Sequence, residues 1–384
     1  MRRLRRGLLG LGVVVAVVAA VGFAGRHHLR GASLVVRSLP SSGGLGRVPL
    51  WRSRPFTEQD SSVPSRHGPL RARLYRPSGH VQRSVLLVPG VHALGIDEPR
   101  LVAFARNLAA LGLAVVTPEL PDLARYRITP RSTDMIEDAA AGLAQKQEWA
   151  PDGRVGLMGI SFAGGLSIVA AGRPLLRDHT AFAMAFGGHG DLPRVLRFLC
   201  TGIQPDGTRR APHDYGVVII LLSTIDRVVP PDQAEGLRTG LLTFLEASHL
   251  DMFDRTRAQE TFDRARRMEK ELPEPSATLL RHVNDRNVAA LGVVLLPYID
   301  EFGDDPALSA ERSEAPRAPV HLLHGLDDNV IPATESTLLA EHLRSRTSVR
   351  CVISPLITHA EVNRQARFRD VWNLTRFWAD LFAE

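Results

Sequence analysis

The sequence contains very little cysteine. Its two cysteines, Cys200 and Cys351, exclude a disulfide scaffold and a zinc site built from cysteine. We expect two buried thiols, with a bridge between them as the alternative. The 384 residues are 44% hydrophobic and 23% charged, which excludes a wholly disordered, collagenous or coiled-coil protein. This length fits one large α/β domain with an insertion, or two ordinary domains.

The chain after residue 30 carries no excess of positive charge. The formal net charge is +6, and six arginines in the first thirty residues, which hold no acidic residue, account for it: Arg2, Arg3, Arg5, Arg6, Arg26 and Arg30. A neutral body offers no basic surface for DNA or RNA, so we expect no nucleic-acid partner. Arginine is used almost to the exclusion of lysine, which is typical of a GC-rich bacterial genome.

One long apolar run, Gly7 to Gly25, follows four arginines at the N-terminus. About nineteen helical residues roughly span the hydrocarbon core of a bilayer. We therefore expect residues 1–30 to be an N-terminal membrane anchor or signal segment. As an anchor it is a single-pass transmembrane helix, with its N-terminus cytoplasmic and the rest of the chain extracytoplasmic. The alternative is export with cleavage after the small-x-small sequence Gly22-Phe23-Ala24.

Strand and helix patterns alternate from about residue 69, after a stretch over 31–66 that is expected to be a linker. The alternation predicts an α/β fold with a mostly parallel central sheet and helices on both faces. Three helices are expected. One spans 101–111, one begins at a capping box of Asp134 and Glu137, and one spans 368–382. Short apolar segments predict strands buried on both faces; they are Leu70–Tyr75, Val85–Val88, Ala114–Thr117, Val155–Met158, Ala181–Phe186, Val320–Leu323 and Cys351–Ile353.

The alternation stops between residues 191 and 318. Asp232 and Glu235 predict a second capping box there, and 253–272 has the pattern of a polar, charged helix. So long a stretch without secondary structure would be implausible in a compact domain, so we expect an inserted helical cap. The alternation of strands and helices then divides into a first part of the core over 67–190 and a second part over 319–384.

The predicted cap contains two segments, Val217–Leu222 and Val288–Leu296, that are more apolar than a polar surface helix needs to be. One interpretation is that they pack the cap onto the sheet domain. The other is that part of the cap, with Phe244 and Leu245 as candidates, lines an apolar ligand pocket.

The sequence Gly159-Ile160-Ser161-Phe162-Ala163 directly follows the predicted strand Val155–Met158 and precedes a helical pattern. A serine in a sharp strand-to-helix turn, with small residues two positions before and after it, is typical of a nucleophile elbow. Such a turn exposes the Ser161 hydroxyl at the carboxyl edge of the sheet. It also directs the Phe162 backbone N–H toward a developing oxyanion. The alternative is a serine that only caps the following helix.

An acid and a histidine are expected after the nucleophile, in that chain order. Asp327 and Asp328 both follow the predicted strand Val320–Leu323 and compete for the role of the acid. His359 follows the last predicted strand on a short loop, where an imidazole can reach both the serine and the acid. A solvated loop histidine is the alternative interpretation of His359.

Other polar residues are less specific. Asp191 follows another strand and is an alternative acid, although capping the next helix is more typical. His92 either touches substrate or stabilises its turn. No H-E-x-x-H motif, P-loop or G-x-G-x-x-G context is present, so we expect no metal and no cofactor.

These motifs resemble those of the α/β-hydrolase superfamily over about residues 69–190 and 319–384. Gly325-Leu326-Asp327-Asp328-Asn329-Val330-Ile331-Pro332 resembles the acid loop of the family, and this resemblance selects Asp328. Val88-Pro89-Gly90-Val91-His92 stands where the family often has His-Gly, with Pro89 in place of the histidine. The resemblance implies that the Val91 N–H is the second oxyanion donor.

Within the superfamily, the lead-in Leu74-Tyr75-Arg76-Pro77 is similar to the serine esterase and dienelactone-hydrolase-like branch. The usual cysteine nucleophile of dienelactone hydrolases is Ser161 here, which argues against that activity. The resemblance implies a serine hydrolase that cleaves a carboxylic ester in a small-molecule substrate through an acyl-enzyme. The alternatives are a peptidase or acyltransferase with the same residues, or a catalytically silent, membrane-tethered binding scaffold. The sequence does not indicate an oligomeric state.

Overall fold

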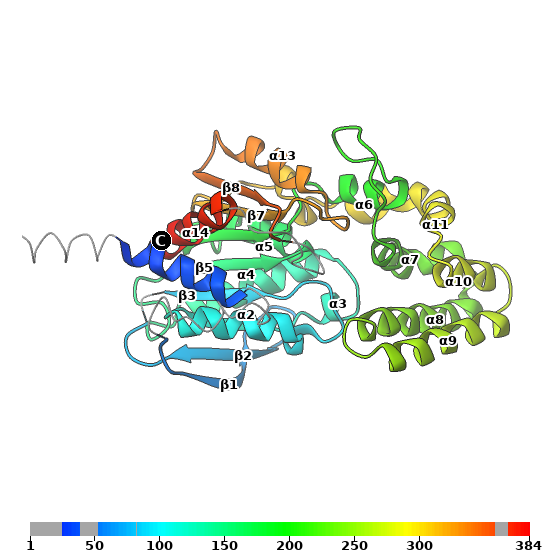
Figure 1. Cartoon of the computed structure of the whole chain (residues 1–384), viewed down its shortest axis with the longest axis horizontal. Coiled ribbons are helices and arrows are strands. Elements are labelled where there is room, and N and C mark those ends of the chain that lie inside the picture. Colours follow the sequence, from blue (N-terminus) through cyan, green and yellow to red (C-terminus); the bar gives the residue numbers. More distant parts are fainter. Residues whose placement is uncertain (1–24, 39–52, 82, 358–367) are drawn as a thin grey trace, which may run out of the picture.

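The described residues form an eight-stranded mixed sheet at the centre of the protein (Figure 1). The computed structural model describes residues 25–38, 53–81, 83–357 and 368–384. The strand order is β1-β2-β4-β3-β5-β6-β7-β8; β2 pairs antiparallel with both β1 and β4, and the remaining pairs are parallel. The strands are β1 (Phe56–Val63), β2 (Leu70–Pro77), β3 (Ser84–Val88), β4 (Ala114–Pro118), β5 (Val155–Ile160), β6 (Thr180–Phe186), β7 (Val320–Gly325) and β8 (Val349–Ser354).

The central strands are buried on both faces, as their continuous apolar sequences predict. Alternate residues of β3 show this, because Val85 and Leu87 belong to one buried cluster and Leu86 and Val88 to the other. Helices α2 (Pro99–Ala110) and α14 (Phe368–Ala383) complete the first cluster. Helices α4 (Pro130–Ala144), α5 (Phe162–Gly172) and α13 (Ala333–Leu343) complete the second. The short α3 (Pro121–Ala124) and the 3₁₀ turn η3 (Gly95–Asp97) lie in the connecting loops.

The prediction of a linker over 31–66 is wrong for the parts of that range that the structure describes. Residues 25–38 are helical, and Leu34 and Val35 are buried in the cluster that contains α14. A Cβ atom at Gly31 would lie 2.4 Å from the Thr375 carbonyl oxygen, so this helix and α14 approach closely. Strand β1 forms the sheet edge, and its polar sequence gives little strand signal because most of its side chains are exposed.

Both predicted capping boxes are also wrong. Helix α4 begins at Pro130, and Asp134 and Glu137 lie inside it, where they accept hydrogen bonds from Arg173 and Arg66. Helix α8 likewise begins at a proline, Pro231, one residue before Asp232. In both helices proline at the first position sets the start, because it needs no hydrogen-bond partner there.

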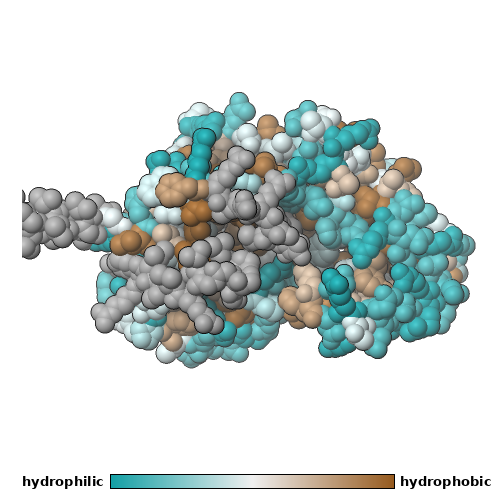
Figure 2. Space-filling view, viewed as in Figure 1, coloured by the Kyte–Doolittle hydropathy of each residue, from teal (hydrophilic) through white to brown (hydrophobic). Residues whose placement is uncertain are grey.

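Between β6 and β7 the chain forms a mainly helical unit, called the cap below. Figure 1 shows it beside the sheet domain, and the surface of α8 and α9 is mostly hydrophilic in the view of Figure 2. The elements of the cap are α6 (Leu192–Thr201), α7 (Asp214–Val228), α8 (Pro231–Leu250), α9 (Arg255–Glu271), α10 (Ser276–Asn284), α11 (Val288–Leu295), η4 (Leu296–Tyr298), α12 (Ile299–Gly303), η5 (Pro306–Leu308) and η6 (Ala310–Arg312).

Both cysteines are free thiols, Cys200 buried and Cys351 partly buried.

The two apolar segments of the cap differ in burial: within Val288–Leu296 only Leu291, Gly292 and Leu295 are buried, and Val293 and Leu296 are exposed. Val217–Leu222 is buried throughout, within α7, and belongs to the cluster that contains α5. The Phe244 ring is buried and meets the Phe262 ring of α9 edge to face, with the centroids 5.5 Å apart. Leu245 is buried in the same cluster. These contacts favour packing over an open pocket lined by Phe244.

The predicted membrane segment lies outside the described residues, except for its last part. Among the helices that the structure describes, none is both long and apolar enough to cross a membrane.

His321 on β7 makes the stability of the protein depend on pH. Its side chain is buried between the rings of Phe182 and Phe377, and neither ring nitrogen has a hydrogen-bond partner among the residues that the structure describes. Burial lowers the pKa of His321 to about 4. The unfolded chain binds this proton near pH 6.5, so the native state loses stability as the pH falls from about 6.5 toward 4.

We expect His321→Leu to remove this loss. Between pH 7 and pH 5, the free energy of unfolding of the wild type should fall by about 2 kcal/mol more than that of the variant. Urea unfolding at the two pH values measures both changes. Equal losses in the two proteins would contradict a neutral, unpartnered His321.

Candidate active site

Ser161 occupies a strained turn between β5 and α5. Its backbone has φ 55° and ψ −132°, an unfavourable conformation for a residue other than glycine. The Ser161 N–H donates to the Phe186 carbonyl oxygen at 2.8 Å, and the Ser161 carbonyl accepts from the Gly164 N–H at 2.8 Å. This is the strand-turn-helix geometry that the sequence predicts for a nucleophile elbow. The side chain is partly exposed.

Small residues make this turn sterically possible. A Cβ atom at Gly159 would lie 2.2 Å from the Ala163 carbonyl oxygen, far inside contact distance. A Cβ atom at Gly90 would lie 3.5 Å from the Ser161 Cβ, so the loop after β3 passes directly beside the serine. The two predicted oxyanion donors, Phe162 and Val91, therefore flank Ser161.

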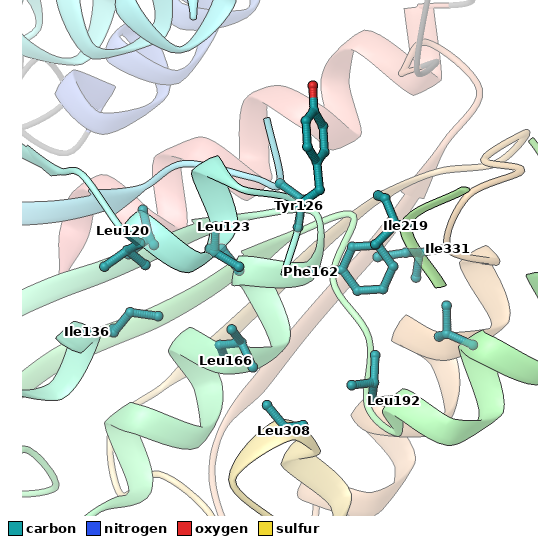
Figure 3. Packing of buried hydrophobic residues seen from close by; sticks show 14 of the residues in the cluster. Leu120, Leu123, Tyr126, Ile136, Phe162, Leu166, Leu192, Ile219, Leu308 and Ile331 are labelled. Carbon is teal, nitrogen blue, oxygen red and sulfur yellow. The ribbon is translucent and has the colours of Figure 1, made fainter. Parts of the chain in front are cut away.

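The Phe162 N–H stands at the start of α5. As the first residue of this helix it has no N–H partner within the helix, and the helix dipole favours negative charge at this end. Its ring is buried and turned toward Ile219 of α7 and Ile331 of the acid loop (Figure 3), and all three belong to one buried cluster. The ring thus fixes the elbow against the cap.

The acid loop after β7 distinguishes the two aspartates. The Asp328 side chain is buried, and its Oδ1 accepts hydrogen bonds from the N–H groups of Val330 and Ile331 at 2.9 and 3.0 Å. Its Oδ2 lies 3.4 Å from Nε2 of His324. Asp327 is exposed and forms a 3.8 Å ion pair with Arg210. A fixed, buried carboxylate suits the orienting role, so the structure favours Asp328.

His359 lies outside the described residues, so its position stays a prediction. The last described residue before it is Ile357. A Cβ atom at Gly325 would lie 2.5 Å from the Ile357 carbonyl oxygen, and Leu326 donates to the Ser354 carbonyl at 3.0 Å. The chain therefore reaches residue 357 directly beside the start of the acid loop.

Asp191, the alternative acid, and His324 of β7 have structural partners. Asp191 caps α6 by accepting from the Arg194 N–H, and it forms an ion pair with Arg312. His324 is buried; it contacts the Ser336 hydroxyl and donates through Nε2 to the Ile331 carbonyl. Asp191 therefore acts as a helix cap, the more typical of its two interpretations.

His92 contacts the cap, a relation that the sequence did not predict. Its Nε2 lies 3.0 Å from Nδ1 of His249 on α8. One residue earlier in the loop, the Val91 carbonyl accepts a 2.5 Å hydrogen bond from the Tyr215 hydroxyl of α7. At the acid loop, the His213 N–H donates to the Asn329 carbonyl at 2.8 Å. Only the fold brings these residues together, since more than a hundred positions separate Tyr215 from either loop.

The described residues contain no cluster of His, Cys, Asp or Glu side chains that could hold a metal ion. A hydroxyl on a strained turn, backbone N–H groups beside it and a fixed carboxylate are groups that acyl-transfer chemistry uses.

The contact between Gly159 and Ala163 predicts that Gly159→Ala is strongly destabilising. The added methyl group collides with a backbone oxygen that cannot move away without distorting the elbow. We expect a loss of about 2–3 kcal/mol in the free energy of unfolding. Gly207→Ala is the control, because that glycine has positive φ but open space around it and should cost only about 1 kcal/mol. Urea unfolding compares the two, and similar costs would contradict the close contact.

Neither family models nor curated proteins match this sequence. Among solved structures, an esterase of Pyrobaculum calidifontis is 16% identical; the match covers 86% of this chain and 88% of that one, with a TM-score of 0.46. A dienelactone hydrolase of Anabaena variabilis is 17% identical over 85% of this chain and 97% of that one, with a TM-score of 0.43. An acylaminoacyl peptidase of Pyrococcus horikoshii is 12% identical over 86% of this chain and 41% of that one, with a TM-score of 0.44.

Three features of the chain itself define its fold. They are the sheet order with an antiparallel second strand, the turn at Ser161 after β5 and the acid loop after β7. With these features the chain has the fold of the α/β-hydrolase superfamily.

Proposed function

We propose that the protein is a serine hydrolase with Ser161 as the nucleophile. The observation that carries this proposal is the backbone conformation of Ser161, φ 55° and ψ −132°, at the turn from a buried strand into a helix. Strain of this kind persists only where the surrounding structure enforces it, and it clusters at active sites. A serine that merely caps a helix would adopt an ordinary extended conformation.

The proposed reaction proceeds through an acyl-enzyme. His359 removes the Ser161 proton as Oγ attacks the substrate carbonyl carbon, and the N–H groups of Phe162 and Val91 bind the resulting oxyanion. The bond to the leaving group then breaks, and His359 gives its proton to that group. Asp328 orients the imidazole and stabilises its cation. A water molecule deprotonated by His359 releases the acid and restores the serine.

The proposed substrate is a carboxylic ester of a small molecule. An ester needs only these residues, because its alkoxide leaves more easily than the amine of a peptide. A peptidase or an acyltransferase with the same residues is the second candidate, and it differs in the leaving group or in the acceptor that replaces water. The mechanism requires no cofactor.

Substitution of the proposed catalytic residues tests the mechanism. Ser161→Ala and His359→Ala should each lower kcat for p-nitrophenyl butyrate by on the order of 10³ or more, and the double variant should be little worse than either. A fluorophosphonate probe should label the wild type at Ser161, as peptide mapping can show. Near wild-type hydrolysis by Ser161→Ala would refute the mechanism. A wild type that is neither labelled nor active would favour the alternative of a catalytically silent binding scaffold.

The two aspartates form a matched pair for testing the acid. Asp328→Asn should lower kcat by a factor on the order of 10³ to 10⁴, because an amide cannot stabilise the imidazolium. Asp327→Asn changes the neighbouring residue in the same way and should leave kcat within about twofold. The reverse order of effects would refute the choice of Asp328 and leave the rest of the mechanism intact.

We also propose that residues 7–25 anchor the protein in a membrane. Val14→Arg/Val18→Arg places two charges in this run, at a cost of about 3 kcal/mol each for insertion. The wild type should stay with membranes through high-salt and alkaline washes, and the variant should not. Val14→Leu/Val18→Leu is the control and should behave like the wild type. A mature N-terminus at Gly25 would instead establish a cleaved signal peptide.

A further inference from the structure

The cap contacts the loop that carries a proposed oxyanion donor. This loop, Gly90 to Leu94, follows β3 and passes beside Ser161. It receives two hydrogen-bond contacts from the cap at consecutive residues, from Tyr215 to the Val91 carbonyl and between His92 and His249. The two cap residues belong to different helices, α7 and α8, so the loop is held at two points.

The Tyr215 contact fixes the donor residue itself. The Val91 N–H and carbonyl belong to the peptide groups on either side of one Cα atom, so holding the carbonyl limits rotation about that residue. The Tyr215 ring is held in turn by an edge-to-face contact with Tyr126, 6.0 Å between centroids. Burial raises the pKa of Tyr215 well above its ordinary value, so the hydroxyl keeps its proton and donates.

The histidine contact has a defined direction. The Leu94 N–H donates to Nδ1 of His92 at 3.1 Å, so His92 carries its own proton on Nε2. That proton is donated to Nδ1 of His249, which must be unprotonated to accept it. Burial and the neighbouring His249 lower the pKa of His92 to about 4, and burial also lowers the pKa of His249. The charged groups that face the pair, Glu98 and Arg100, form an ion pair with each other.

We propose that Tyr215 and His249 are positioning residues, which hold the Val91 N–H where the oxyanion forms. The cap is then part of the catalytic apparatus and more than a cover over the site. This inference rests on the proposed function, because it needs an oxyanion at Ser161. It predicts a loss of transition-state stabilisation, with little change in substrate binding, when either contact is removed.

Tyr215→Phe is the decisive variant. We expect kcat for p-nitrophenyl butyrate to fall about tenfold to hundredfold, less than the loss of a whole oxyanion donor, while KM changes less than about twofold. The rate of fluorophosphonate labelling at Ser161 should fall in parallel, since charge also develops on the phosphonyl oxygen. Tyr298→Phe is the control, because it removes another tyrosine hydroxyl of the cap, which lies 3.5 Å from the Arg227 carbonyl oxygen in an exposed position.

His249 allows a test by restoration. His249→Leu removes the acceptor for the His92 proton and should lower kcat about tenfold. His249→Asn places a carbonyl oxygen near the position of Nδ1 and should recover most of that loss. Thermal unfolding of every variant is measured alongside.

Four results would overturn the inference. They are an unchanged kcat and labelling rate in Tyr215→Phe, a rise in KM alone, equal losses in Tyr215→Phe and Tyr298→Phe, or His249→Asn as impaired as His249→Leu. Each leaves the proposed function standing if Ser161→Ala is inactive. A wild type that neither hydrolyses esters nor reacts with the probe refutes the proposed function, and this inference with it.

Discussion

The backbone turn at Ser161 is the constraint on which the rest of the site depends. Its unfavourable conformation persists because β5 enters it from the middle of the sheet and α5 leaves it packed on the same sheet. The contact between Gly159 and Ala163 leaves no room for a larger residue at Gly159. The packing of β5 and α5 thus compensates a local conformational free-energy cost of about 1–3 kcal/mol. The turn holds the Ser161 hydroxyl clear of the sheet.

Helix α7 connects the three segments that meet around this turn. Its N-cap residue, His213, donates to the acid loop, Tyr215 donates to the loop Gly90 to Leu94, and Ile219 faces the Phe162 ring beside Ser161 (Figure 3). Three contacts within about two helical turns therefore relate loops that follow three different strands. A single rigid helix can hold their relative positions more closely than three independent surface loops could.

The parts of the fold that the sequence predicts are those governed by local physics. The strand β5, the turn at Ser161 and the acid loop follow from burial patterns and from residues adjacent in the chain. Strand β1 was missed because an exposed edge strand has no apolar pattern. The contacts of Tyr215 and His249 could not be predicted, because nothing local to an α-helical tyrosine or histidine specifies a partner more than 120 residues away.

The cap is held very differently at its two ends. At the end of the cap that follows β6, the Arg194 guanidinium is paired with Glu311 and with the fully buried Glu335 of α13. Glu335 also accepts hydrogen bonds from the N–H groups of Gly190 and Asp191. Breaking one partner of such a buried group costs about 3–5 kcal/mol. Beside Ser161 the polar contacts of the cap to the loop Gly90 to Leu94 are neutral hydrogen bonds, each worth about 1 kcal/mol. The individual polar contacts that hold the cap to the loop Gly90 to Leu94 are therefore weaker than those around Arg194 and Glu335.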